Sequence, residues 1–181
     1  AITDYEEALR ADPSAVAPHF NIVSALLALG RTDEALSNLR NAIEADRKSA
    51  SPAGELVTQS FHENCMALFE NAVPDSFASY LTAALELVDG TAYLARFEES
   101  LAMTVFALLR DHAKISEERF GYVLRAFEEA VGKRIDVSVA VRFLRVGIAH
   151  FKRNDRKALL ELPREERLMF CRELGIEEPS T

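Results

Sequence analysis

Residues 14–47, SAVAPHFNIVSALLALGRTDEALSNLRNAIEADR, are the most informative stretch for the fold. The pattern of residues 35–46, in the second half of this stretch, also occurs at residues 1–12. Residues of the same kind recur 34 positions apart, placing small or apolar side chains on one helical face and an Asp where each helix is expected to end. The matching residues are Ala1, Ile2, Tyr5, Ala8 and Asp12 in the first copy and Ala35, Leu36, Leu39, Ala42 and Asp46 in the second. This spacing predicts a helical repeat.

Residues 14–47 resemble one complete tetratricopeptide repeat, whose unit is a pair of antiparallel helices. The residues that carry the resemblance are Asn21, Ile22, Ala25, Leu26, Gly30, Asp33, Glu34, Ala35, Leu39, Ala42 and Asp46. Ala25 and Ala35 are small where the two helices would touch. Gly30 permits the left-handed backbone of the turn. The resemblance therefore implies a helix, a tight turn and a second helix.

The match covers residues 1–48, as one partial and one complete repeat, and it departs from the family pattern at three positions. His19 stands where the family usually has Trp, Val23 replaces the first Gly, and Arg47 replaces the closing Pro. Thr32 is expected to cap the second helix with its hydroxyl group.

Beyond residue 48 the sequence predicts further helices that have lost the exact period. Caps and breaks indicate helices near 55–71, 75–88, 91–110, 116–131, 136–153 and 163–175. The segment 149–158 is a degenerate echo of the repeat turn, with Asn154 where Gly would stand. The expected fold is all-α: antiparallel helix pairs in a tetratricopeptide-like superhelix, continuing over residues 55–175 as diverged repeats or as a helical bundle.

The resemblance implies a scaffold or adaptor that binds a peptide or a partner helix in a concave helical groove. The first helix of the repeat would line that groove with Ala17, Phe20, Ser24 and Leu27, which suit an apolar segment. Two alternatives stay open at this point. The chain could be an accessory or regulatory domain of a larger enzyme, or a domain that associates with itself.

Basic residues form a second candidate surface. Net charge is −8, but residues 133–157 are basic whereas the chain before and after them is acidic. Arg142, Arg145, Lys152 and Arg156 recur at spacings close to one helical stripe, which could bind an acidic peptide, a phosphate or a nucleic acid. The interpretation we favour is that they pair with acidic residues of the same chain. Nucleic-acid binding is not expected of an acidic protein.

The sequence contains no clear motif for catalysis, metal binding or nucleotide binding. His62 and Cys65 share a helix face, but zinc needs two more such ligands and no second pair exists. His19, His112 and His150 lack any accompanying nucleophile motif, and no glycine-rich phosphate loop occurs. We therefore expect no catalytic residue, no metal and no cofactor, and a chain that is not itself an enzyme.

The sequence also bears on the cellular setting. It has no apolar run long enough to span a bilayer, so no membrane partner is expected. Two scattered cysteines, Cys65 and Cys171, do not form a disulfide framework and favour a reducing, cytoplasmic location. Because Ala1 already lies in a helical pattern, we interpret the chain as part of a longer protein.

Overall fold

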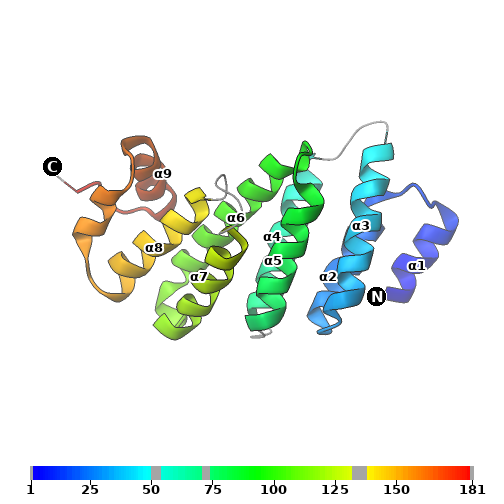
Figure 1. The fold of residues 1–181 in the computed structure, drawn as a ribbon, viewed down its shortest axis with the longest axis horizontal. Helices are drawn as coiled ribbons and strands as arrows, with labels where there is room; N and C mark the ends of the chain where they lie inside the picture. Colours follow the sequence, from blue (N-terminus) through cyan, green and yellow to red (C-terminus); the bar gives the residue numbers. More distant parts are fainter. Residues whose placement is uncertain (1, 50–53, 71–73, 132–137, 180–181) are drawn as a thin grey trace. The chain divides into compact units, whose positions relative to one another are not determined.

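The computed structural model describes residues 2–49, 54–70, 74–131 and 138–179, and these residues form an all-α protein with no strand among them (Figure 1). The chain divides into two compact units, residues 1–100 and residues 101–181, with the boundary inside one long helix. The all-α fold expected from the periodicity is confirmed.

Over its described residues, the first unit holds five whole helices and the start of a sixth. These are α1 (Ile2–Ala11), α2 (Val16–Ala28), α3 (Thr32–Lys48), α4 (Gly54–Glu70), α5 (Pro74–Val88) and α6 (Tyr93–Arg110). Within this unit α2 packs against α1, α3 and α4, and α5 packs against α3 and α4. Helix α2 is therefore covered on several sides.

The turn between α2 and α3 forms as the sequence predicts. Gly30 adopts a φ of 72°, a left-handed conformation that only glycine reaches without strain. The Gly30 N–H donates to the Leu27 carbonyl (3.0 Å), and the Arg31 N–H donates to the Leu26 carbonyl (2.9 Å). These bonds satisfy carbonyls at the end of α2 and reverse the chain, so α3 returns along α2.

The expected cap of α3 is wrong. Thr32 is the first residue of the helix rather than the residue before it. Its hydroxyl oxygen is buried and has no hydrogen-bond partner within the described part of the chain. Arg31 occupies the capping position instead, and its guanidinium group pairs with Glu34. The start of α3 therefore has no side-chain cap, and an ion pair between Arg31 and Glu34 spans its first turn.

Aromatic rings and buried polar groups form the core of the first unit. Phe61 of α4 contacts Phe20 of α2 and Phe97 of α6 edge-on, with ring centroids 6.4 and 5.0 Å apart. Asp46 near the end of α3 is fully buried and accepts a 2.6 Å hydrogen bond from the Tyr93 hydroxyl. The polar pair matters because a buried carboxylate needs such donors to offset its lost hydration.

The second unit holds the end of α6, then α7 (Glu117–Val131), α8 (Ser138–Lys152) and α9 (Arg164–Leu174). Two short 3-10 helices, η1 (His112–Lys114) and η2 (Arg156–Glu161), lie between them and were not predicted. Phe106, Phe143 and Phe170 contact one another in the core of this unit, bringing α6, α8 and α9 together.

Most helix ends lie within two residues of those expected, and the capping groups explain why. The Ser116 hydroxyl accepts from the Arg119 N–H (3.2 Å) at the start of α7, and Gly175 ends α9 with a φ of 63°. Asn154 adopts a φ of 54°, as its glycine-like position predicted, but η2 follows it rather than an α-helix. The expected cap at Asp136 lies outside the described residues.

Candidate functional site

Helix α2 forms the floor of an open groove, because α1 packs on one side of it and α3 on the other. We call this depression the α1–α3 groove; its volume is about 550 Å³. Its lining residues are Ile2, Glu6, Leu9 and Arg10 from α1, His19, Ile22 and Leu26 from α2, and Arg31, Glu34, Asn38 and Asn41 from the start of α3. Ligand sites typically have volumes of roughly 300–1,000 Å³, so the groove can hold part of a chain.

The floor is apolar and one wall carries amides. Ile22 and Leu26 lie four residues apart, so they share a helix face, and little of either side chain is exposed. On α3 the residues Glu34, Asn38 and Asn41 recur at helical spacing and face the same groove. Such a floor accepts an apolar side chain, while an amide wall can hydrogen-bond to a peptide backbone.

A second depression of about 350 Å³ continues from the first. His19 and Asn41 line both, so the two open onto each other at these residues. Beyond them the second depression is lined by Pro13, Ser14, Glu44, Ala45, Lys48 and Ser49. The Asn41 amide is exposed and makes no hydrogen bond within the part of the chain described. Its donors and acceptor are thus available at the centre of the combined groove.

Two pairs of charged residues along the combined groove are already paired within the chain. Arg31 donates to both oxygens of Glu34 (2.7 and 2.6 Å), which raises the pKa of Arg31 and lowers the pKa of Glu34. The negative charge of Glu6 on α1 raises the pKa of Arg31 further. In the second depression Lys48 lies 3.2 Å from Glu44. The centre of the combined groove, where His19 and Asn41 lie, is polar and has no carboxylate.

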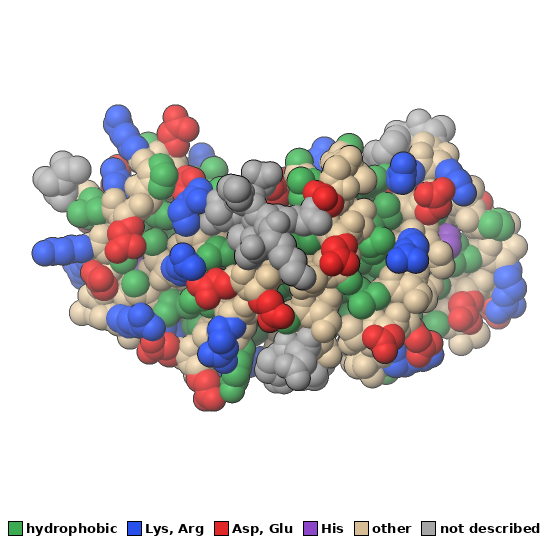
Figure 2. All heavy atoms as spheres, in the orientation of Figure 1, with side chains coloured by type: hydrophobic (Ala, Val, Ile, Leu, Met, Phe, Trp, Pro, Cys, Tyr) green, Lys and Arg blue, Asp and Glu red, His purple; other side chains and the backbone are tan. Residues whose placement is uncertain are grey.

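The surface around α3 carries charges of both signs. Figure 2 shows Lys and Arg side chains interspersed with Asp and Glu over α3, with apolar side chains beside them. A separate cleft of about 590 Å³ lies between α3 and α5, where Leu36, Ser37 and Arg40 face Ala83, Glu86 and Leu87. Because Asn41 also borders this cleft, α3 has a depression on each flank.

Two of the four residues predicted to meet a partner lie in the core instead. Phe20 and Leu27 are 0% and 1% exposed, Ser24 is half-buried, and Ala17 alone among the four is exposed. The cause is α4, which packs on this face of α2 and brings Phe61 against Phe20. The face that the resemblance assigns to a partner is thus covered by the chain itself in the first unit.

Ser24 belongs to a buried polar chain that the sequence did not reveal. Its hydroxyl donates to the Asn64 side chain (2.6 Å), and the Asn64 amide donates to the Tyr80 hydroxyl (2.9 Å). Burial raises the pKa of Tyr80 well above its ordinary value. These two hydrogen bonds link α2, α4 and α5. Little in the sequence indicated them, because Asn64 follows two other polar residues and its burial, which requires hydrogen-bond partners, appears only in the structure.

The predicted basic stripe consists of four residues, and three of them make contacts within the second unit. Arg142 of α8 donates to both oxygens of Glu166 on α9 (3.0 and 2.6 Å), and Arg145 donates to Glu128 on α7 (2.8 and 2.5 Å). The Lys152 ammonium donates to the His112 carbonyl, while Arg156 is exposed. Three of the four side chains therefore connect elements of this unit, and two of them, Arg142 and Arg145, pair with carboxylates as the intramolecular interpretation expects.

Two of the isolated histidines, His112 and His150, pack against an aromatic ring. The His112 ring stacks on Phe151 (4.1 Å between centroids), and the His150 ring meets Phe151 edge-on. Burial, with the charges of Arg156 and His112, lowers the pKa of His150, and burial lowers the pKa of His62. Among the residues the structure describes, no three metal-binding side chains gather at one point, and no helix is long and apolar enough to cross a membrane.

Fold and groove together define the class of the molecule. It is an all-α protein whose first unit packs helix pairs and leaves an open, amide-lined groove beside α3. Comparison with family models, curated proteins and solved structures found no match to this chain.

Proposed function

We propose that the first unit is a protein-interaction module, and that the α1–α3 groove binds an extended segment of a partner protein. We also propose that residues 1–48 are a tetratricopeptide-type repeat. The observation that carries the binding proposal is the combination of an apolar floor at Ile22 and Leu26 with the available amide of Asn41.

The groove favours one kind of occupant. Arg31 pairs with Glu34 and Lys48 with Glu44, and α1 adds one charge of each sign to the lining. The groove therefore has no large excess of either charge and offers no strong attraction to a highly charged ligand. An extended chain advances about 3.3 Å per residue and presents alternate side chains to opposite sides. A segment of low net charge can therefore place an apolar side chain on the floor and its backbone against Asn38 and Asn41. This site differs from the face of α2, covered by α4, on which a peptide or a partner helix was expected.

The location of the site is tested with two neighbouring residues that face different depressions. A displayed library of random linear peptides is selected on the protein, and the enriched peptides are measured against two variants. Asn38 lines the α1–α3 groove, whereas Ser37 lines the cleft between α3 and α5. Both Asn38→Arg and Ser37→Arg add a long charged side chain to the same helix.

We expect Asn38→Arg to weaken peptide binding at least about tenfold, which corresponds to about 1.4 kcal/mol, and Ser37→Arg to leave it unchanged. Circular dichroism of both variants checks that α3 still forms. Loss of binding in Ser37→Arg with retention in Asn38→Arg would move the site to the other flank of α3. Failure of the library to yield any peptide that competes for the groove would remove the proposal.

A cytoplasmic setting is also proposed, and Cys65 and Cys171 support it. Both are buried thiols rather than a disulfide. Burial raises the pKa of Cys171, which keeps it in the unreactive thiol form. Thiols persist in this state where the compartment is reducing.

A further inference from the structure

The outer face of α9 carries an apolar pair. Leu168 and Met169 are 45% and 43% exposed, while Phe170 and Cys171 of the same helix are buried in the second unit. Helix α9 is therefore apolar on two sides, and only one of them packs into the core. Removing the exposed pair from water would be favourable, so this side is a candidate docking surface.

Opposite charges flank the pair at equal spacing. Glu165 lies three residues before Leu168, and Arg172 lies three residues after Met169. All four side chains are exposed, and their spacing places them on one face of the helix. We call these four residues the α9 stripe. It is antisymmetric in charge about its midpoint, with an acid at one end, a base at the other and two apolar residues between.

We propose that the α9 stripe pairs with the same stripe of a second copy of this chain, with the two helices antiparallel. A twofold axis through the midpoint sets each Leu168 against Met169 of the other copy, and each Glu165 against Arg172. A twofold interface must be self-complementary, and this sequence of charges meets that condition only in the antiparallel orientation. Charge complementarity therefore selects a second copy as the occupant.

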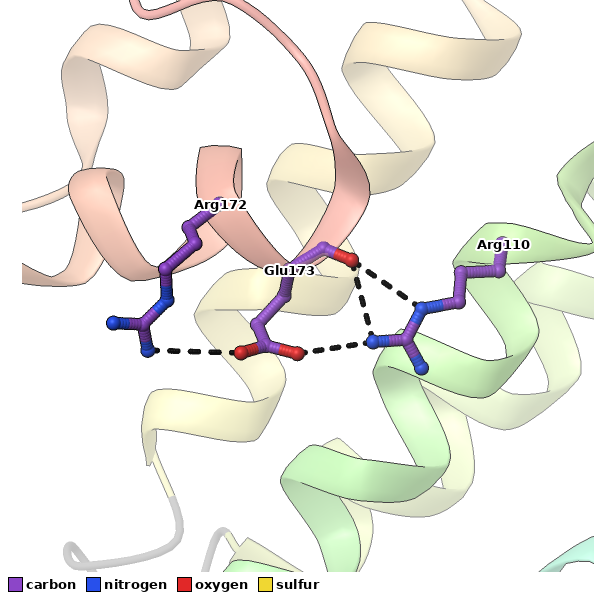
Figure 3. A network of polar contacts seen from close by, with 3 residues as sticks. All are labelled: Arg110, Arg172 and Glu173. Carbon is purple, nitrogen blue, oxygen red and sulfur yellow. Dashed lines mark hydrogen bonds and ion pairs between the residues drawn. The ribbon is translucent and has the colours of Figure 1, made fainter.

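The second unit holds α9 firmly at its C-terminal end and leaves Arg172 exposed. Figure 3 shows Glu173 between two arginines: its carboxylate accepts from Arg110 of α6 at 3.0 Å and lies 3.6 Å from Arg172. Arg110 also donates to the Glu173 backbone carbonyl, one of the last carbonyls of the helix. The long contact leaves Arg172, whose side chain is 76% exposed, able to meet a second carboxylate.

The pairing is expected to be weak. Stable interfaces bury about 1,600 Å² in total, and one face of an 11-residue helix supplies only part of such an area. Association should therefore depend on protein concentration and weaken as salt screens the two ion pairs. Dimerisation through α9 does not depend on the groove beside α3, so the two proposals fail separately.

Sedimentation velocity over a concentration series tests the pairing with charge-reversal variants. We expect Glu165→Arg alone, and Arg172→Glu alone, to weaken self-association at least about tenfold, because each places like charges opposite one another. A mixture of these two variants should associate again, since each then meets its opposite charge. The double variant E165R/R172E should also recover, because both ion pairs are restored with reversed sign.

The apolar centre is tested with Leu168→Asp, which should also abolish association. Leu29→Asp is its control, because Leu29 is 64% exposed and lies in the first unit. The proposal is overturned if the protein stays monomeric at every concentration, or if the mixed variants fail to associate. It is equally overturned if E165R/R172E remains as weak as the single variants, since another partner would then be needed to explain the stripe.

Discussion

At the scale of single residues, buried polar contacts give the first unit a specific dependence on pH. Tyr93 donates to the buried Asp46 carboxylate, and burial, together with that negative charge, raises the pKa of Tyr93 far above its usual value near 10. The unfolded tyrosine loses its proton at a lower pH than the folded one. The associated stability is therefore fully present below about pH 10 and is lost as pH rises further.

Replacing Tyr93 with Phe should destabilise the protein by about 1–3 kcal/mol at neutral pH, because Asp46 loses a donor in a buried position. The variant should also lose less stability between neutral pH and pH 11 than the original protein. Urea unfolding at several pH values measures both effects. Tyr122→Phe is the matched control, since Tyr122 bonds to Glu118 at the surface and should change stability by less than about 0.5 kcal/mol. Equal effects of the two substitutions would show that the hydrogen bond between Tyr93 and Asp46 adds no specific stability.

Two glycines inside helices of the second unit have opposite surroundings. A Cβ atom added to Gly147 of α8 would overlap the buried side chain of Leu109. One added to Gly121 of α7 would approach only the Arg125 side chain, at 3.9 Å. We therefore expect Gly147→Ala to destabilise by about 1–3 kcal/mol, because the core is overpacked.

Gly121→Ala should instead stabilise by about 0.5–1 kcal/mol, because alanine restricts the unfolded chain and favours helix. Thermal unfolding of both variants compares them directly. A stabilising Gly147→Ala would show that α6 and α8 do not approach each other closely at this point.

Among the helices, the ends of each helix could be predicted from the sequence, whereas the neighbouring helices that bury its faces could not. Gly30, Ser116 and Gly175 act through their own backbone or hydroxyl groups, so their roles were predictable. The burial of Phe20 and the hydrogen bond of Ser24 depend on α4, about 40 residues later in the chain. No local pattern specifies that contact, so the face of α2 assigned to a partner could not be recognised as core.

The covering of α2 by α4 predicts different costs for two residues of one helix. Phe20→Ala should destabilise by about 3–5 kcal/mol, because it removes a fully buried ring that contacts Phe61. Ala17→Ser should cost less than about 0.5 kcal/mol, because Ala17 is exposed. Chemical denaturation measures both. A small cost at Phe20 would mean that its ring faces solvent, as a partner-binding role would require.

At the scale of the whole molecule, the 34-residue period accounts for the start of the chain and then fails. Helices α4 and α5 lack that register but fall in the same compact unit as α1–α3, and Phe61, Asn64 and Tyr80 provide contacts that link α2, α4 and α5. In the second unit the arginines of α8 were visible in the sequence. Their carboxylate partners lie 17 and 24 residues away, so the ion pairs required the structure.

The groove beside α3 was not predicted because its lining comes from three helices and mixes apolar, amide and charged residues. Its amides, Asn38 and Asn41, carry no motif of their own. They become a candidate site only when α1 is placed opposite them across α2.

Peptide binding in the α1–α3 groove can be followed in methyl NMR spectra recorded during titration with a library-selected peptide. We expect saturable shifts of the Ile2, Ile22 and Leu26 methyl signals, since these residues line the groove. The Leu36 and Leu87 signals from the cleft between α3 and α5 should stay in place. Shifts confined to Leu36 and Leu87, or to residues of the second unit, would contradict peptide binding in this groove.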